Sequence, residues 1–132
     1  FTKGELATMR TKLESHFDAL RTGCATRIDF AGISTVCKLG QAIESQGVVR
    51  GLREIFDNTE QTLLSLMGRA DHPDGWCQLV PSSEQLVQIR EMLDLHMFQL
   101  SKLSYGEYQS AWGLMIGRVR SSGGVVIGKN HA

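Results

Sequence analysis

The sequence predicts an all-α protein, a small bundle of four to five helices that we expect to be dimeric. Apolar residues recur at intervals of three and four along most of the chain, which is the period of one helix face. Serine or threonine followed three residues later by glutamate or glutamine marks several helix starts, the pattern of a capping box. No stretch shows a strong strand pattern, so helices account for the expected core.

The first helix is expected from about Lys3 to Leu20. Thr2 is suited to cap it, and Glu5 stands in the capping-box position. Gly23 follows the last apolar residue and favours the left-handed conformation in which many helices end. One stripe carries the apolar residues Leu6, Met9, Leu13, Phe17 and Leu20.

The middle of the chain predicts two further helices with a break near Gly47. Asp29 is the expected N-cap of the first, which continues to about Ser45. The helical period resumes at Val48 and continues to Met67. One long bent helix fits the same pattern, because a glycine inside a helix costs only about 1 kcal/mol against alanine.

Residues 69–81 interrupt the helical period and predict a loop. This stretch contains two prolines, one glycine and two aspartates. Proline lacks a backbone donor and fixes φ, so it disfavours regular structure here. We expect Trp76 and Leu79 to hold this loop against the bundle.

The stretch Ser82–Leu103 predicts a helix that is apolar around more than half its circumference, and we expect it to be central. Ser82 and Gln85 form its capping box. One face carries Leu86, Ile89, Leu93, His96, Leu100 and Leu103, and this stripe is widened by Met92, Leu95 and Phe98. A helix that is apolar on so many sides is typical of a bundle centre or a subunit interface.

The last helix is expected from Tyr105 to about Ser121, after a tight corner at Ser104. Large apolar residues line one side of it, and small residues such as Gly113 and Gly117 line the other. The small face permits close approach of another helix. We therefore divide the chain into a single helical domain, residues 1–122, and a C-terminal tail, residues 123–132.

Composition argues against several classes of function. The 132 residues fit one domain with a core of its own. Fourteen basic residues balance fourteen acidic ones, which argues against a nucleic-acid binder, since such proteins usually carry a basic excess. No apolar run reaches transmembrane length. The chain begins at Phe1 rather than methionine, so we expect a trimmed form of a longer protein.

The three cysteines favour a reducing compartment. Cys24, Cys37 and Cys77 cannot all pair within one chain, and none lies in a C-x-x-C motif. Cys37 stands among apolar residues and is expected to be buried. We expect reduced thiols and a cytoplasmic location.

No motif for catalysis, a cofactor or a metal stands out. His96 is the most tempting residue, but it has no second histidine or carboxylate in helical register. His72, Asp74 and Cys77 supply three donors in one loop, yet no matching pair occurs elsewhere for zinc. Neither a nucleophile elbow nor a phosphate loop is present. We predict no catalytic, cofactor-binding or metal-binding residues, and no cofactor.

The function that these observations favour is a non-enzymatic, regulatory protein–protein interaction module. A small helical antiactivator that masks a transcription factor, or an adaptor, is the expected type. Its expected partner is another protein, and a homodimer is also expected. No membrane partner is expected, and the charge balance disfavours nucleic acid as a partner. The expected interface residues lie on the last two helices: Leu93, His96, Phe98, Leu100, Leu103, Tyr108, Trp112 and Met115.

Two other functions are weighed against this one. A DNA-binding transcriptional regulator is the alternative, with Arg50, Arg53, Arg69, Arg118 and Arg120 as its candidate contacts. The helix after the Ser104 corner has few polar groups suited to reading bases, which disfavours a helix-turn-helix. The third possibility is an enzyme with a pocket formed by Trp76, Cys77 and His96.

Overall fold

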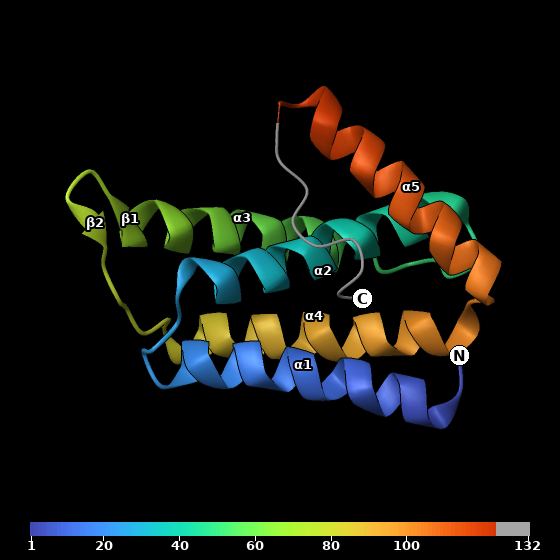
Figure 1. The fold of residues 1–132 in the computed structure, drawn as a ribbon, viewed down its shortest axis with the longest axis horizontal. Coiled ribbons are helices and arrows are strands. Elements are labelled where there is room, and N and C mark those ends of the chain that lie inside the picture. Colours follow the sequence, from blue (N-terminus) through green and yellow to red (C-terminus); the bar gives the residue numbers. More distant parts are fainter. Residues whose placement is uncertain (124–132) are drawn as a thin grey trace.

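The structure is a computed structural model that describes residues 1–123, so all but the first residue of the expected C-terminal tail lies outside the described residues. The described part is a helical bundle with one very short hairpin, which confirms the expected all-α class (Figure 1). Its elements are α1 (Lys3–Arg21), α2 (Arg27–Gln46), α3 (Arg53–Ala70), β1 (Asp71–His72), β2 (Gly75–Trp76), α4 (Ser83–Lys102) and α5 (Tyr105–Ser121). None of the described helices is both long and apolar enough to cross a membrane.

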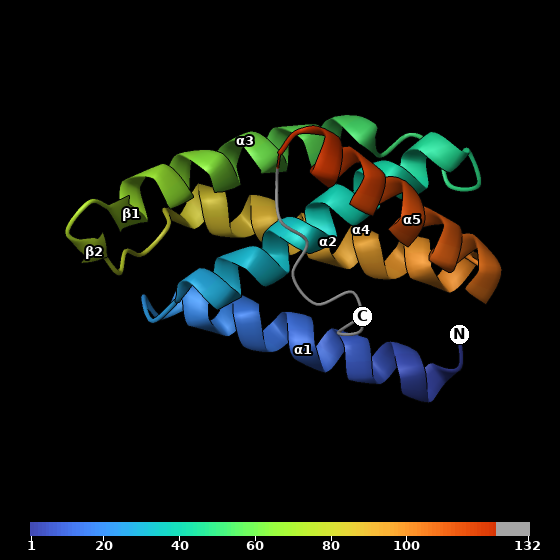
Figure 2. The ribbon, with the colours of Figure 1, turned by 45° about the horizontal axis from the view of Figure 1, so that its top comes forward.

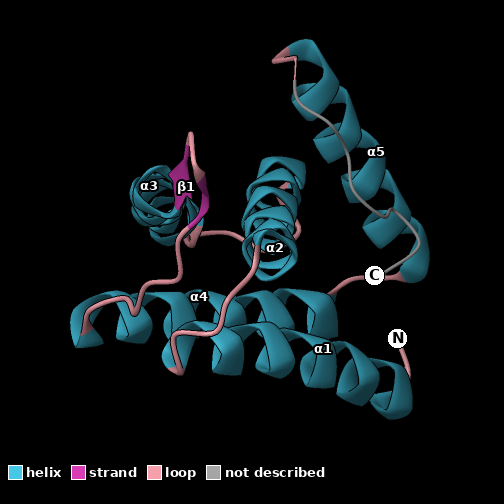
Figure 3. Ribbon diagram, turned by 60° about the vertical axis from the view of Figure 1, so that its left-hand side comes forward, coloured by secondary structure: helices cyan, strands magenta, loops and turns pink. Residues whose placement is uncertain are grey.

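The helices form two crossed layers. Helices α1 and α4 lie side by side in one layer, and α2 and α3 pack across them (Figure 3). Helix α5 leaves the end of α4 and packs mainly against α2. Helix α2 therefore contacts each of the other four helices, and it shares the central position that the sequence assigned to α4 alone.

Three capping boxes begin their helices where the sequence predicts them. The side chains of Thr2, Ser82 and Ser104 each accept a hydrogen bond from the backbone N–H three residues later, at 3.1–3.2 Å. The glutamate or glutamine side chain at that later position accepts a hydrogen bond from the backbone N–H of the capping residue. These contacts satisfy backbone donors that a helix start leaves open, so each start is specified locally.

The start of α2 differs from the prediction. Thr26 is the N-cap, and Asp29 is the third residue of the box rather than the cap itself. The Asp29 carboxylate accepts the Thr26 backbone N–H at 2.9 Å. An aspartate serves equally well at either position, so the sequence alone did not separate the two.

The break after α2 is real, but it is longer than expected. Gly47 caps the helix in the left-handed conformation with φ +80°, where a side chain would be strained. Residues 48–52 are not helical, so α3 begins at Arg53 and not at Val48. The Glu44 carboxylate accepts the Leu52 backbone N–H at 3.1 Å, which fixes this connection to the end of α2.

The predicted loop contains a small hairpin that periodicity could not reveal. Asp71 pairs with Trp76 and His72 with Gly75 in an antiparallel register. The Trp76 indole donates to the carbonyl of Ala25 at 2.9 Å and stacks edge-on against Phe30, with ring centroids 5.4 Å apart. The expectation that Trp76 ties this segment to the bundle is confirmed, and Leu79 packs against the same core.

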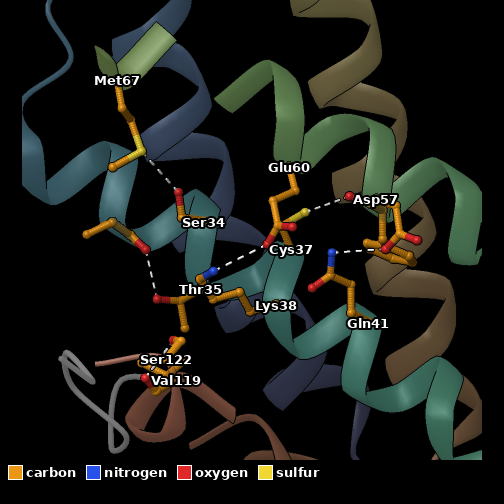
Figure 4. Close-up of polar contacts among 12 residues, drawn as sticks. Ser34, Thr35, Cys37, Lys38, Gln41, Asp57, Glu60, Met67, Val119 and Ser122 are labelled. Atoms are coloured by element: carbon orange, nitrogen blue, oxygen red, sulfur yellow. Dashed lines mark hydrogen bonds and ion pairs between the residues drawn. The ribbon is translucent and has the colours of Figure 1, made fainter. Parts of the chain in front are cut away.

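Polar and sulfur contacts join α2 to α3 on the face away from α1 (Figure 4). Lys38 pairs with Glu60 at 3.3 Å, and Gln41 donates to Asp57 at 3.1 Å. The Cys37 thiol donates to the Phe56 carbonyl, also at 3.1 Å. Cys37 is buried as expected, and burial raises the pKa of its thiol to about 12. This face of α2 therefore packs against α3.

Candidate functional site

Seven of the eight expected interface residues are buried within the chain. Only Phe98 is exposed, at 48%. The other seven, all on α4 and α5 or the corner between them, are no more than 6% exposed: Leu93, His96, Leu100, Leu103, Tyr108, Trp112 and Met115. The apolar stripe of α4 thus packs inside one chain and does not by itself require a second copy. The homodimer stays a prediction.

Four of these buried residues meet at the floor of a half-open cavity of about 340 Å³. We call it the α1–α2 cavity, because α1 and α2 form its mouth and sides while α4 and α5 close it below. Figure 2 shows α1 diverging from α2 away from the loop that joins them. Its lining residues are Met9, Lys12, Leu13, His16, Ile28, Ala31, Gly32, Thr35, Val36, Leu39, His96, Leu100, Tyr108 and Trp112.

The lining is largely apolar, and its exposure is graded from mouth to floor. Ile28, in the first turn of α2, is 74% exposed, although it is a large aliphatic residue. His96 and Leu100 at the floor are 3% and 2% exposed. A concave apolar site with a few polar groups is the usual form of a small-molecule or anchor-residue pocket, and its volume lies at the small end of the range of about 300–1,000 Å³.

His16 forms one wall near the mouth and is held by a fixed partner. Its Nδ1 lies 2.9 Å from a carboxylate oxygen of Asp29. Burial acts to raise the pKa of Asp29, but the hydrogen bonds from His16 and Thr26 outweigh it and hold that pKa below its usual value. The opposite edge of the imidazole lies over Gly32, where a Cβ would stand 2.6 Å from Nε2. A side chain at position 32 would therefore force the His16 ring to shift from its place between α1 and α2.

His96 brings a nitrogen to the floor whose protonation follows from its neighbours. The Gln99 amide nitrogen donates to the Gly40 carbonyl at 3.1 Å, so the Gln99 oxygen faces His96 Nδ1, also at 3.1 Å. An amide oxygen only accepts, which requires Nδ1 to carry the proton and leaves Nε2 as an acceptor. Burial lowers the pKa of His96 to about 4, so the ring is neutral at physiological pH.

Trp112 and Tyr108 supply the remaining polar atoms of the floor. The Trp112 indole N–H is buried and has no hydrogen-bond acceptor. Burial raises the pKa of the Tyr108 phenol, and the neighbouring indole partly offsets this, although the two groups are not in hydrogen-bonding geometry. An unpaired buried donor costs about 1–3 kcal/mol, so a group that brought an acceptor to this wall would gain that amount.

The other candidate sites are not assembled. Within residues 1–123, no three histidine, cysteine, aspartate or glutamate side chains are arranged to hold a metal ion. Trp76 and Cys77 lie at the hairpin and do not line the cavity that contains His96, so this cavity does not bring together the three residues considered for an enzymatic pocket. The hydroxyl of Thr35, which also lines the cavity, donates to the Ala31 carbonyl within its own helix.

Two of the five arginines named for DNA binding, Arg53 and Arg118, lie among acidic and polar side chains. Arg53 pairs with Asp57 at 3.6 Å, one turn along α3. Arg118 donates to the Ser45 hydroxyl at 2.9 Å, and both residues border a shallow depression that also contains Glu60. Carboxylates interleaved with arginine oppose the close approach of a phosphate backbone.

No protein-family model matches the chain, and no similar chain is found among curated proteins or among solved structures. We therefore infer function from the α1–α2 cavity alone. Sequence reasoning missed this cavity, although it named four of its floor residues as an interface. The sequence does show a bulky isoleucine, Ile28, beside a predicted helix cap and a glycine, Gly32, one helical turn later. Only the crossing of α1 over α2 brings both into one cavity with His16.

Proposed function

We propose that this protein is a non-enzymatic regulatory module that binds another protein over the mouth of the α1–α2 cavity. The observation that supports it best is the exposed Ile28 at the rim of a half-open apolar cavity. A bulky aliphatic side chain exposed at the edge of a concave apolar surface is typical of a docking site. A small antiactivator or adaptor has this form, with the regulated protein covering the mouth.

The experiment places a photo-crosslinking amino acid at position 28 in cells that make the protein. Position 87 is the matched control, because Val87 is also an exposed aliphatic residue, at 66%, but lies on α4 outside the cavity. We expect a discrete crosslinked protein from position 28 and not from position 87.

The captured protein is then tested with purified components. Ile28→Glu should weaken its binding at least tenfold, while Val87→Glu leaves the affinity unchanged. Ile28→Glu keeps the fold, because an acidic residue in the first turn of α2 is favourable for the helix. Equal binding by both variants, or no discrete crosslink from position 28, would refute the proposal.

DNA binding is the alternative, and the balanced charge around Arg53 and Arg118 does not favour it. Retention on heparin at low salt that falls steeply with added salt would support the DNA-binding alternative instead. We expect the protein to elute at low salt.

A further inference from the structure

The α1–α2 cavity has a buried polar floor that a protein partner at its mouth does not reach. His96 and Trp112 lie there among apolar side chains. The buried indole N–H of Trp112 has no hydrogen-bond acceptor within the described residues, and the hydrogen bond that His96 makes to Gln99 uses Nδ1 and not Nε2. Nε2 of His96 is an acceptor, because Gln99 fixes the proton on Nδ1. Nε1–H of Trp112 is a donor. The floor therefore offers one donor and one acceptor in an apolar enclosure.

We propose that this floor binds a neutral, largely hydrocarbon small molecule through a hydroxyl or amide group that donates to His96 Nε2 and accepts from Trp112 Nε1–H. A group with both functions satisfies both protein atoms at once. A carboxylate offers no proton to Nε2, and it would lose its hydration at the apolar floor without a full set of hydrogen bonds in return, which is costly. The lysine of the lining, Lys12, is an exposed residue and not one of the buried residues of the floor. The ligand is thus selected by hydrogen-bonding character as well as by size.

Access to the indole donor involves a small movement. Nε1 of Trp112 is closed to solvent in the structure, although the side chain lines the cavity. The proposal requires the ring to tilt toward the cavity so that the ligand's acceptor meets the N–H. The N–H signal of this indole is consequently a direct reporter of binding.

The protein contains its own reference for that signal. Of the two tryptophans, Trp76 already donates to the Ala25 carbonyl at 2.9 Å and lies away from the cavity. A ¹⁵N–¹H spectrum of the full chain should show one indole signal that responds to ligand and one that does not. Loss of one signal in Trp76→Phe assigns the pair.

Three probes with chains of the same length separate the contributions of the hydroxyl proton and of ligand charge to binding. They are 1-octanol, its isomer methyl heptyl ether, and octanoate at pH 7.5. We expect 1-octanol to shift the Trp112 signal in a saturable way while the Trp76 signal stays fixed. The ether accepts but cannot donate, so it should bind about 2- to 10-fold more weakly, the effect of one hydrogen bond. Octanoate should bind at least tenfold more weakly than 1-octanol.

His96→Asn tests the acceptor. The asparagine amide can still donate to Gln99, but Nε2 is removed, so 1-octanol should lose its advantage over the ether while the affinity for the ether is unchanged. Trp112→Phe keeps an aromatic ring and removes the donor, so both probes should weaken by a similar factor. Circular dichroism verifies that each variant is folded.

Location is tested by filling the cavity. Thr35→Leu adds apolar volume at a lining position, and it should weaken all three probes. Thr11→Leu is the matched control, because Thr11 also bonds to the carbonyl four residues earlier, but it is exposed and outside the cavity. That variant should bind as the parent does.

Several results would overturn this inference. They are the absence of a saturable Trp112 shift with 1-octanol, tighter binding of octanoate than of 1-octanol, and equal affinity for 1-octanol and its ether isomer. Undiminished binding by a folded Thr35→Leu variant would place the ligand elsewhere. All of these measurements use the isolated chain, so their failure is independent of whether a protein docks at Ile28.

Discussion

Acidification should destabilise this protein through His96 before its carboxylates are protonated. The pKa of His96 is lowered from 6.5 to about 4 by burial, so the unfolded chain binds a proton more tightly than the folded one. Protonation therefore favours unfolding. The stability that neutral His96 allows is fully present above pH 6.5 and is lost as the pH falls toward 4.

The size of the effect follows from those two pKa values. Linkage between 6.5 and about 4 gives a loss of about 2 kcal/mol in the free energy of unfolding when the pH falls from 7 to 5. Glu14 and Asp29 have lowered pKa values, so both stay ionised through this window. The change between pH 7 and 5 thus reports mainly histidine.

The assay is urea denaturation followed by circular dichroism at several pH values between 7 and 5, on the parent and on His96→Asn. The variant cannot titrate at this position, so its free energy of unfolding should change less between the two pH values, by about 2 kcal/mol. Subtracting the two curves removes the contributions of the other histidines. Parallel curves would show that His96 is not held neutral in the folded chain, and the tautomer argument for the cavity floor would fail with it.

Three further predictions concern packing. Leu100→Glu should unfold the chain, because Leu100 is 2% exposed at the cavity floor; a folded monomer by circular dichroism and light scattering would contradict its place in the core. Gly40→Ala should destabilise the protein by about 1–3 kcal/mol, because the added Cβ would stand 2.3 Å from the Phe56 ring. At Gly113 an added Cβ meets nothing within 4 Å, so Gly113→Ala should stabilise α5 by up to about 1 kcal/mol. Thermal melts of both variants test this comparison. Cys37 should resist a thiol reagent at pH 8 while the other two cysteines, both exposed, react at once, and three fast thiols would refute its burial.

Much of the local structure was determined by the sequence. The boxes that begin at Thr2, Ser82 and Ser104, and the helix end at Gly47, depend on residues within four positions of one another. The apolar stripe of α4 could likewise be predicted from the spacing of its apolar residues alone. Position along a helix is a local property, so these elements could be derived without the fold.

Whether the α4 stripe is core or interface was decided only by the tertiary structure. An apolar face is the same in sequence whether another helix of the chain or a second copy covers it. The fold buries His96, Leu100 and Trp112 inside one chain, and it leaves Phe98 and Ile28 exposed. The expected interface and the observed exposed residues therefore coincide only at Phe98.

The cavity was likewise invisible before the helices were placed. It depends on the angle at which α1 leaves α2, on the contact between His16 and Gly32, and on α4 and α5 closing the floor. The lining residues are up to 103 positions apart, from Met9 to Trp112, on a chain of 132, and no local pattern relates them. The sequence by itself determined which segments are helical and which faces are apolar, because hydrogen bonds and side-chain periodicity act over a few residues. Only the packing of α1 across α2 decided that two histidines, a tryptophan and an exposed isoleucine share one site.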